Sequence, residues 1–475
     1  MKNCKIMALT LMLSACSSVV TPYPPKINPS IEKLSQNTLS ADTTKAYKKE
    51  QSSRDEILFN MELGRLSQLK GDLKQSIKYY KNAIEDVKDD EEKALVSVGD
   101  ISSQIGATIV NDNVISYTGK PFEHIMLHTN QALNYLFNKD IENAAPEIRL
   151  AGDNQQKALE NNQKAIDDAK EKEELSSEKL GIATKFIKDN FTSFGIDEVA
   201  GKVKNEFQNA YAFYISGIVY ELHGEKEDAY LDYKNALEMM PQNAYFQKDV
   251  IRLAKELGHE EELEGLKKKF SSSYKCVEAN KNNSNFIVLI EDGFVTQKEE
   301  VKFALPVDLK GGLVNVNFPV LKKAKYVKPS IFTVSDNGKN LGSASLATDF
   351  DVLSFRSFKD SLLGIVTRSI IREGTRVAAQ YGASKIKDGV GSTFAKLGLF
   401  AADNKLTIAD LRGWYTLPSN AQVLSANLPV GTHNITIKNS DGKKVDIKVN
   451  VEDGKKSIVR VIKAGNSYYT QEVTL

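Results

Sequence analysis

The sequence has little of the material from which catalytic, metal or disulfide centres are built, since its 475 residues include three cysteines, five histidines and one tryptophan. The formal net charge is only +1, so no global attraction to nucleic acid is expected. The glycine-containing segment 388–393 lacks the lysine of a phosphate-binding Walker loop. We therefore predict a non-enzymatic protein with no catalytic residue, no cofactor and no nucleic-acid partner.

The few histidines do not suggest a metal centre either. His124 and His128 stand four residues apart, which places both rings on one face of a predicted helix. A transition-metal site would need a third ligand, and none is evident in the sequence. Packing or solvation of the two rings is the preferred interpretation, and we predict no metal.

No apolar run is long enough to span a bilayer, which needs about 20 residues. The N-terminal run, 6–13, follows Lys2 and Lys5 and ends in Leu-Ser-Ala-Cys16. A charged start, a short apolar stretch and small residues before a cut site describe a secretory signal peptide. The ending resembles the lipobox of bacterial lipoproteins, in which the cysteine after the cut carries the lipid. We expect residues 1–15 to be removed and Cys16 to be lipidated.

The lipobox implies a location as well as an anchor. Ser17 and Ser18 follow Cys16, and the aspartate that usually retains a lipoprotein in the inner membrane is absent. The resemblance therefore favours the outer membrane, on its periplasmic face, with the membrane contacted through the lipid. An ordinary signal peptide with a chance cysteine is the alternative. Cys276 would be the single cysteine left beside the lipidated one, which excludes an intramolecular disulfide.

Proline is scarce except near this anchor. Residues 16–40 contain Pro22, Pro24, Pro25 and Pro29 among polar residues. Such a composition favours an extended polyproline conformation over a packed core. We predict a lipidated tether over this segment.

Residues 41–272 have a helical pattern interrupted by turns. The clearest unit, 211–242, has small residues at Gly217 and Ala229 and a proline at Pro241. These spacings are typical of the tetratricopeptide repeat, a helix–turn–helix unit of 34 residues. Less complete copies cover residues 63–83, 132–151 and 250–263. Stacked units of this kind bury a continuous core, so the predicted fold is an α+β multidomain protein that begins with an all-α, tetratricopeptide-like solenoid.

The period changes after about residue 275. Short β-branched and aromatic runs predict strands in a mixed β/α domain over 280–418, and a broad apolar stripe predicts a long amphipathic helix over 352–386. Regularly spaced strands and turns over 419–475 predict a separate small β-sandwich.

Two groups of side chains are candidates for binding a protein partner. Early positions of the first repeat helix commonly face the concave groove, where repeats bind peptides or helices. The groove candidates are Asn60, Tyr135, Asn209 and Tyr220. A basic stripe with four-residue spacing could meet lipid phosphates or an anionic glycan, or could simply solvate the helix and pair with Asp360 and Glu373. The residues of this stripe are Arg368, Arg372 and Arg376.

The only tryptophan lies beside an arginine and an acid, in the segment 409–418. Trp414 and Arg412 could form an interface hot spot. Alternatively, Trp414 fills the space between helix and sheet while Asp410 and Arg412 pair at its edge, and we favour this second interpretation.

Several blocks together resemble a family of bacterial lipoproteins with tetratricopeptide-like repeats. These blocks are 117–136, 147–149, 209–217, 410–418 and 428–431. In some genomes this family is encoded beside a lipoprotein activator of penicillin-binding proteins, which implies a role in the envelope. The segment 428–435 also resembles PEGA-type β-domains, small accessory modules of surface proteins.

The predicted function is a protein-binding scaffold anchored in the outer membrane, with a partner in envelope assembly or peptidoglycan synthesis. The alternatives are an envelope enzyme, such as a glycan hydrolase in the C-terminal domain, and a surface-exposed adhesion or virulence lipoprotein. A hydrolase would need convergent acids in a cleft, one of them with a pKa raised by burial. The sequence indicates no oligomeric state.

Overall fold

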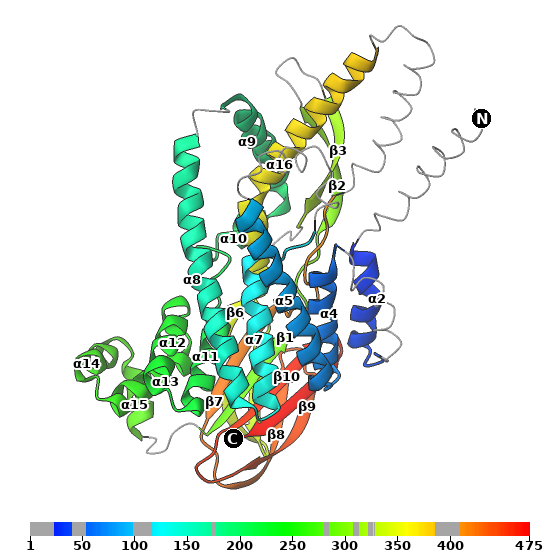
Figure 1. The fold of residues 1–475 in the computed structure, drawn as a ribbon. Helices are drawn as coiled ribbons and strands as arrows, with labels where there is room; N and C mark the ends of the chain where they lie inside the picture. Colours follow the sequence, from blue (N-terminus) through cyan, green and yellow to red (C-terminus); the bar gives the residue numbers. More distant parts are fainter. Residues whose placement is uncertain are drawn as a thin grey trace.

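The computed structural model describes residues 23–39, 54–97, 116–172, 177–279, 285–306, 313–321, 326, 328–384 and 409–475. Within these ranges the protein is a mixed α+β structure, as expected, in which helices from the first half of the chain lie against β-sheets from the second half (Figure 1). Cys16 falls outside the described ranges. No described helix has both the length and the apolar composition required to span a membrane.

Most helices of the first half form consecutive pairs. The pairs are α4 (Glu56–Leu69) with α5 (Leu73–Ser97), α7 (Pro121–Phe137) with α8 (Ile141–Lys172), and α11 (Ala210–His223) with α12 (Lys226–Met239). Helices α9 (Ser177–Phe191) and α10 (Ile196–Ala200) lie between the second and third pairs in the chain. Helices α13 (Ala244–Leu257), α14 (Glu260–Lys269) and α15 (Ser271–Ala279) complete this part of the molecule. Each pair packs on the next.

Glycine permits the closest helix contacts in two of these pairs. A Cβ atom at Gly64 would lie 2.3 Å from the Tyr80 ring, and one at Gly217 would lie 2.5 Å from the Tyr233 ring. In both pairs the tyrosine comes sixteen residues after the glycine. The absence of a Cβ atom therefore lets the aromatic ring of the second helix lie directly on the backbone of the first.

The strands in the described ranges form three sheets. They are β1 (Phe286–Asp292), β2 (Glu299–Pro306), β3 (Leu313–Val320), β4 (Phe332–Asp336), β5 (Lys339–Ser343), β6 (Ser345–Asp349), β7 (Asn420–Ala426), β8 (Gly431–Asn439), β9 (Lys444–Val451), β10 (Ser457–Ala464) and β11 (Ser467–Thr474). The five-stranded sheet has the order β11-β10-β1-β7-β6, the four-stranded sheet has the order β5-β4-β8-β9, and β2 pairs with β3. Only β1 and β10 are parallel; the other described pairs are antiparallel.

The sequence predicts a mixed domain that ends at residue 418 and a separate sandwich after it. The structure has no such division, because strands from both segments share sheets. Leu289 of β1 pairs with Arg460 of β10 on one side and with Val423 of β7 on the other. All seven residues of β1 are buried. An apolar strand of this kind needs a neighbour on each side and a layer on each face, and the C-terminal segment supplies both neighbours. The predicted small sandwich is therefore part of sheets shared with the preceding segment.

The segment predicted to be an extended tether is partly a packed helix. Helix α2 (Tyr23–Ser35) buries Tyr23, Ile27 and Leu34, whose spacing places them along one helical face. Its prolines at positions 24 and 25 lie in the first turn, where a missing N–H removes no helical hydrogen bond. The tether prediction thus fails for residues 23–35, because the buried apolar face of this segment stabilises a helix despite its prolines.

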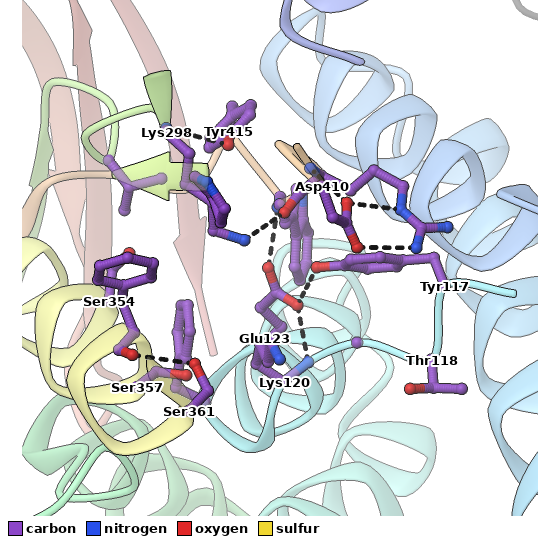
Figure 2. A pocket seen from close by; sticks show the side chains of 18 of the residues that line it. Tyr117, Thr118, Lys120, Glu123, Lys298, Ser354, Ser357, Ser361, Asp410 and Tyr415 are labelled. Atoms are coloured by element: carbon purple, nitrogen blue, oxygen red, sulfur yellow. Dashed lines mark hydrogen bonds and ion pairs between the residues drawn. The ribbon is translucent and has the colours of Figure 1, made fainter. Parts of the chain in front are cut away.

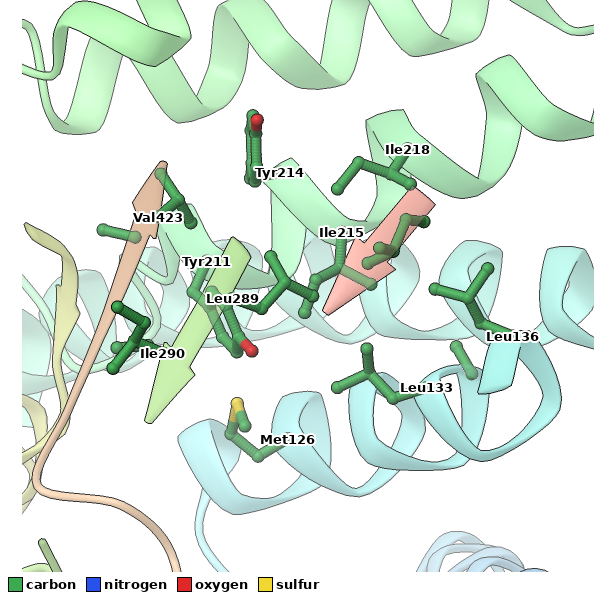
Figure 3. Packing of buried hydrophobic residues seen from close by; sticks show 14 of the residues in the cluster. Met126, Leu133, Leu136, Tyr211, Tyr214, Ile215, Ile218, Leu289, Ile290 and Val423 are labelled. Carbon is green, nitrogen blue, oxygen red and sulfur yellow. The ribbon is translucent and has the colours of Figure 1, made fainter. Parts of the chain in front are cut away.

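The five-stranded sheet lies against the first helices of the pairs. Leu133 and Leu136 of α7 and Ile215 of α11 belong to one apolar cluster with Leu289 of β1 and Val423 of β7 (Figure 3). Apolar residues of the four-stranded sheet belong to the same core. The central sheet is therefore enclosed between helices and a second sheet.

A second core lies at the end of the molecule where β2, β3 and α16 (Phe350–Ser384) meet α9 and α10 (Figure 1). Phe186 and Phe191 of α9 contact Phe303 of β2 and Phe318 of β3, with ring centroids 5.2–6.2 Å apart. Helix α16 contributes Phe355 and further apolar residues. The prediction of a long helix in this region is confirmed.

A buried cluster of charges joins the helices to the central sheet. The carboxylate of Glu291 in β1 accepts hydrogen bonds from Arg65 of α4, from Arg460 of β10 at 2.8 Å and from the Tyr211 hydroxyl of α11 at 2.9 Å. Arg460 also donates to Asn130 of α7 at 3.0 Å. Burial raises the pKa of Glu291, but the two arginines outweigh this effect and lower it to about 2. This carboxylate therefore joins β1 directly to α4, α11 and β10, and joins α7 indirectly through Arg460.

The glycine contact predicts a steric effect. Gly64→Ala should lower the free energy of unfolding by about 1–3 kcal/mol, because the new methyl group would displace the Tyr80 ring. Gly152→Ala in α8 is the matched control, since nothing lies within 4 Å of its Cβ position, and it should be neutral or stabilising by up to about 1 kcal/mol. Urea unfolding of the two variants measures the difference. Equal effects would contradict the close contact.

The charge cluster predicts a larger effect. Glu291→Gln should lower the free energy of unfolding by about 3–5 kcal/mol, because it leaves two buried arginines without their carboxylate. Glu264→Gln removes an exposed partner of Lys267 and should leave the urea midpoint unchanged within error. Comparable stability of the two variants would show that the helices do not rely on Glu291.

Candidate functional site

The four residues predicted to line an open groove do not do so. Asn60, Tyr135 and Asn209 are buried, and Tyr220 is half-buried under the guanidinium of Arg149. Asn209 caps α11 and accepts a hydrogen bond from Thr348 of β6. The face of the helices that was expected to be open is covered by the five-stranded sheet of the same chain (Figure 3). The groove prediction is therefore wrong for this structure.

A cavity of about 390 Å³ lies where five separate segments meet. Its walls come from residues 116–123 at the start of α7, residues 295–298 between β1 and β2, Pro319 of β3, helix α16, and the loop 410–415 (Figure 2). Its volume is within the usual range for small-molecule sites, about 300–1,000 Å³. We take this cavity as the candidate functional site.

One glutamate organises the wall formed by α7. The carboxylate of Glu123 accepts hydrogen bonds from the Tyr117 hydroxyl at 2.6 Å, the Lys120 backbone N–H at 2.8 Å and the Trp414 backbone N–H at 2.8 Å. Trp414 is 1% exposed, and its indole packs edge-on against Tyr80. Glu123 therefore fixes the tryptophan loop to the start of α7.

The pairing of the neighbouring arginine confirms the second interpretation of this segment. Arg412 donates two hydrogen bonds to Asp410, at 2.8 and 2.9 Å, and a third to Asp55 at 2.8 Å. Its guanidinium also lies over the Tyr117 ring, 5.4 Å from the centroid. Burial lowers the pKa of Arg412, but its two carboxylate partners raise it above its ordinary value. Arg412 and Trp414 are thus internal to the structure and form no exposed hot spot.

Two lysines face the cavity from opposite walls. The ammonium of Lys298 donates a hydrogen bond to the Arg412 carbonyl at 2.7 Å. The pKa of Lys298 is lowered to about 8, chiefly by burial and in part by nearby Lys120, against the opposing effect of the Asp410 and Glu123 carboxylates. Within the described ranges, neither lysine forms an ion pair with an acid. The cavity wall therefore carries two lysines outside ion pairs, together with the carboxylates of Asp410 and Glu123.

Helix α16 contributes a row of hydroxyl groups. Ser354, Ser357 and Ser361 lie on one helical face and line the cavity (Figure 2). Arg368, from the predicted basic stripe, continues this row along the helix and also lines the cavity. The side chains of Arg372 and Arg376 lie outside the described part of the chain. The structure thus brings three predicted residues, Arg368, Arg412 and Trp414, to one site.

A glutamate lies just behind the serine row. Burial raises the pKa of Glu206 to about 7, although its hydrogen bond with Ser357 and the nearby Lys120 lower it. One of its carboxylate oxygens has no hydrogen-bond partner. Sequence reasoning missed Glu206, Lys120, Lys298 and the serines. Only the serines left a signal, namely their helical spacing within an otherwise apolar face.

The predicted histidine pair is divided between two structural roles. His124 hydrogen-bonds the Thr118 carbonyl at 2.7 Å, and His128 pairs with Glu147 at 2.7 Å. No cluster of three or more metal-ligating side chains occurs in the described ranges. Cys276 is exposed on α15.

The 409–418 segment is also held by a second glutamate. Glu62 of α4 is fully buried and accepts hydrogen bonds from Tyr23 of α2 at 2.7 Å, the Tyr415 backbone N–H at 2.8 Å and the Thr416 backbone N–H at 3.3 Å. Burial raises the pKa of Glu62 to about 7, although these hydrogen bonds lower it. Glu62 therefore links the N-terminal helix to the loop that walls the cavity.

No protein-family model matches the chain, and a search of curated proteins finds no match.

The buried Glu62 predicts a pH dependence. Its pKa is higher in the folded state, so its contribution to stability is fully present below about pH 4.5 and falls by about 3 kcal/mol as the pH rises through 7. The stability difference between the wild type and Glu62→Gln should therefore decrease by this amount between pH 4.5 and pH 8. Urea unfolding at both pH values measures it.

The exposed Glu261 provides the control for this experiment. Glu261→Gln should follow the wild type at both pH values. A stability difference for Glu62→Gln that does not change with pH would rule out the titration of Glu62 in this range.

Proposed function

We propose that this protein is an outer-membrane lipoprotein that acts as a non-enzymatic scaffold in the cell envelope, in envelope assembly or peptidoglycan synthesis. The Leu-Ser-Ala-Cys16 motif supports the anchor. The observation that carries the proposal is the docking of α2 on the folded body soon after this cysteine. Six residues, 17–22, separate Cys16 from Tyr23.

The short connection limits the distance between Cys16 and the folded body. Six extended residues reach about 20 Å. Tyr23 is buried against Phe59 and Tyr415, with ring centroids 5.7 Å from each. A lipidated Cys16 would therefore hold the folded body beside the membrane surface, so that a partner would be bound at a nearly fixed height.

The helical pairs are proposed to be tetratricopeptide-like units. Gly64, Ala132 and Gly217 are equivalent positions, because the chain turns with positive φ seven residues after each, at Gly71, Lys139 and Gly224. Small residues at the crossing and a fixed turn position are typical of this repeat. Since the sheet of the same chain covers their inner face, we propose that a protein partner binds the outer face formed by α5, α8 and α12.

The cavity chemistry favours binding over glycan hydrolysis. Asp410 is held by Arg412, which helps to lower its pKa against the effect of burial. The Glu123 carboxylate accepts three hydrogen bonds. A hydrolase would require one lining acid with a raised pKa as the proton donor. The two acids that line the cavity have structural roles instead, and Glu206, whose pKa burial raises to about 7, lies behind Ser357 and is not among the lining residues. This arrangement supports a binding protein.

The anchor is tested with Cys16→Ser and with Cys276→Ser as the matched control. Metabolic labelling with a palmitate analogue, followed by membrane fractionation, should show labelled, membrane-bound protein for the wild type and the control. Cys16→Ser should be unlabelled and soluble. Retention of label in Cys16→Ser would contradict lipidation at this residue.

The scaffold is tested by in-cell crosslinking and affinity purification. A third variant carries a 20-residue Gly/Ser insertion after Ser18, which keeps the lipid but releases the body from the membrane. The wild type should recover a specific envelope protein, and both Cys16→Ser and the insertion variant should recover less of it. Recovery of no envelope protein above background would contradict the scaffold.

A further inference from the structure

We propose that the cavity between α7, α16 and the 410–415 loop binds a small anionic sugar, that is, a hydroxyl-rich molecule that carries one carboxylate or phosphate group. This binding site is additional to the scaffold role and does not depend on it. Its argument rests on the charges, the hydroxyl groups and the size of the cavity.

The anionic group is specified by two lysines. Lys298 uses one ammonium proton for the Arg412 carbonyl, and its other two protons are available on the cavity wall. Lys120 lines the same cavity from the start of α7. Charge-assisted hydrogen bonds from ammonium groups to a carboxylate or phosphate are about twice as strong as neutral ones. An anion between the two lysines would supply the acid partner that both lack within the described ranges.

The acids in the wall do not serve as that partner. Asp410 accepts two side-chain hydrogen bonds from Arg412. The Glu123 oxygens accept from Tyr117, from the Lys120 backbone and from the Trp414 backbone. Both carboxylates thus hold the wall together, and an entering anion need not displace either of them.

The rest of the ligand is specified by hydroxyl groups and apolar surface. Ser354, Ser357 and Ser361 line the cavity from α16. Ser361 donates its proton to the Phe358 carbonyl at 2.9 Å and Ser357 is hydrogen-bonded to Glu206, so these two hydroxyls offer acceptor oxygens to a ligand. Phe122, Phe358 and Ile365 also line the cavity and give it apolar surface. Hydroxyl groups beside apolar side chains suit a ring with polar edges and an apolar face, as in a pyranose. The 390 Å³ volume accommodates one or two such rings.

The single tryptophan provides a direct measurement, because Trp414 lines the cavity and no other residue shares its fluorescence. The purified full-length lipoprotein in detergent is titrated at pH 6.5 with three probes of matched structure. These probes are N-acetylglucosamine, N-acetylmuramic acid and N-acetylglucosamine 1-phosphate. Saturable changes in Trp414 emission with one or both acidic sugars, at least tenfold tighter than with the neutral sugar, are expected. Binding of N-acetylmuramic acid would identify a carboxylate as the preferred anionic group, and binding of N-acetylglucosamine 1-phosphate would identify a phosphate.

The lysines are tested separately. Lys298→Met keeps the length of the side chain and should raise the dissociation constant of the acidic sugar at least tenfold, and Lys120→Met should act in the same direction. Lys448→Gln on β9 is the control, since this exposed lysine lies in the four-stranded sheet, outside the cavity wall. Binding by Lys448→Gln should equal that of the wild type. Urea unfolding checks that each variant is folded, and Ser357→Ala replaces any lysine variant that is not.

Three results would overturn the proposal. These are the absence of a saturable change with both acidic sugars, equal binding of the neutral and acidic sugars, and unchanged binding in folded Lys298→Met and Lys120→Met. None of them bears on the scaffold, whose test depends on Cys16 and on recovery of a protein partner. Failure of either proposal can therefore be told from failure of the other.

Discussion

The buried carboxylate of Glu291, paired with Arg65 and Arg460, fixes how the helices dock on the central sheet. Arg65 and Arg460 are buried with it, so the three groups have no access to water and must satisfy one another. Arg65 belongs to α4, Arg460 to β10 and the third partner, Tyr211, to α11. The helices can therefore take only one position on the sheet, and that position covers the inner face of the helical pairs.

Buried carboxylates also join separate elements at the cavity. Glu62 of α4 and Glu123 of α7 each accept backbone N–H groups of the 409–418 segment. A loop without regular secondary structure is thus fixed by two carboxylates from neighbouring helical pairs. Because this loop carries Arg412 and the tryptophan, the helices fix the cavity wall as well as the core. The proposed site for an anionic sugar is a consequence of how the helices and sheet dock.

Local signals in the sequence were largely sufficient for the elements and for some contacts. The helical pattern before residue 272, the strands after 286 and the long helix α16 are present as predicted. The pairing of Asp410 with Arg412 was also predictable, because the two residues are neighbours in the chain. The tether prediction failed at α2, where the apolar spacing of Tyr23, Ile27 and Leu34 outweighs the prolines.

The helices and strands could be predicted from the sequence, because hydrophobic spacing and turn residues act within short segments. The pairing of β1 with β7 and β10, the filling of the expected groove and the meeting of Lys120 with Lys298 in one cavity arise from tertiary contacts. These contacts join residues separated by more than a hundred positions. Their partners are selected by burial and charge pairing across the whole fold, which no local pattern records.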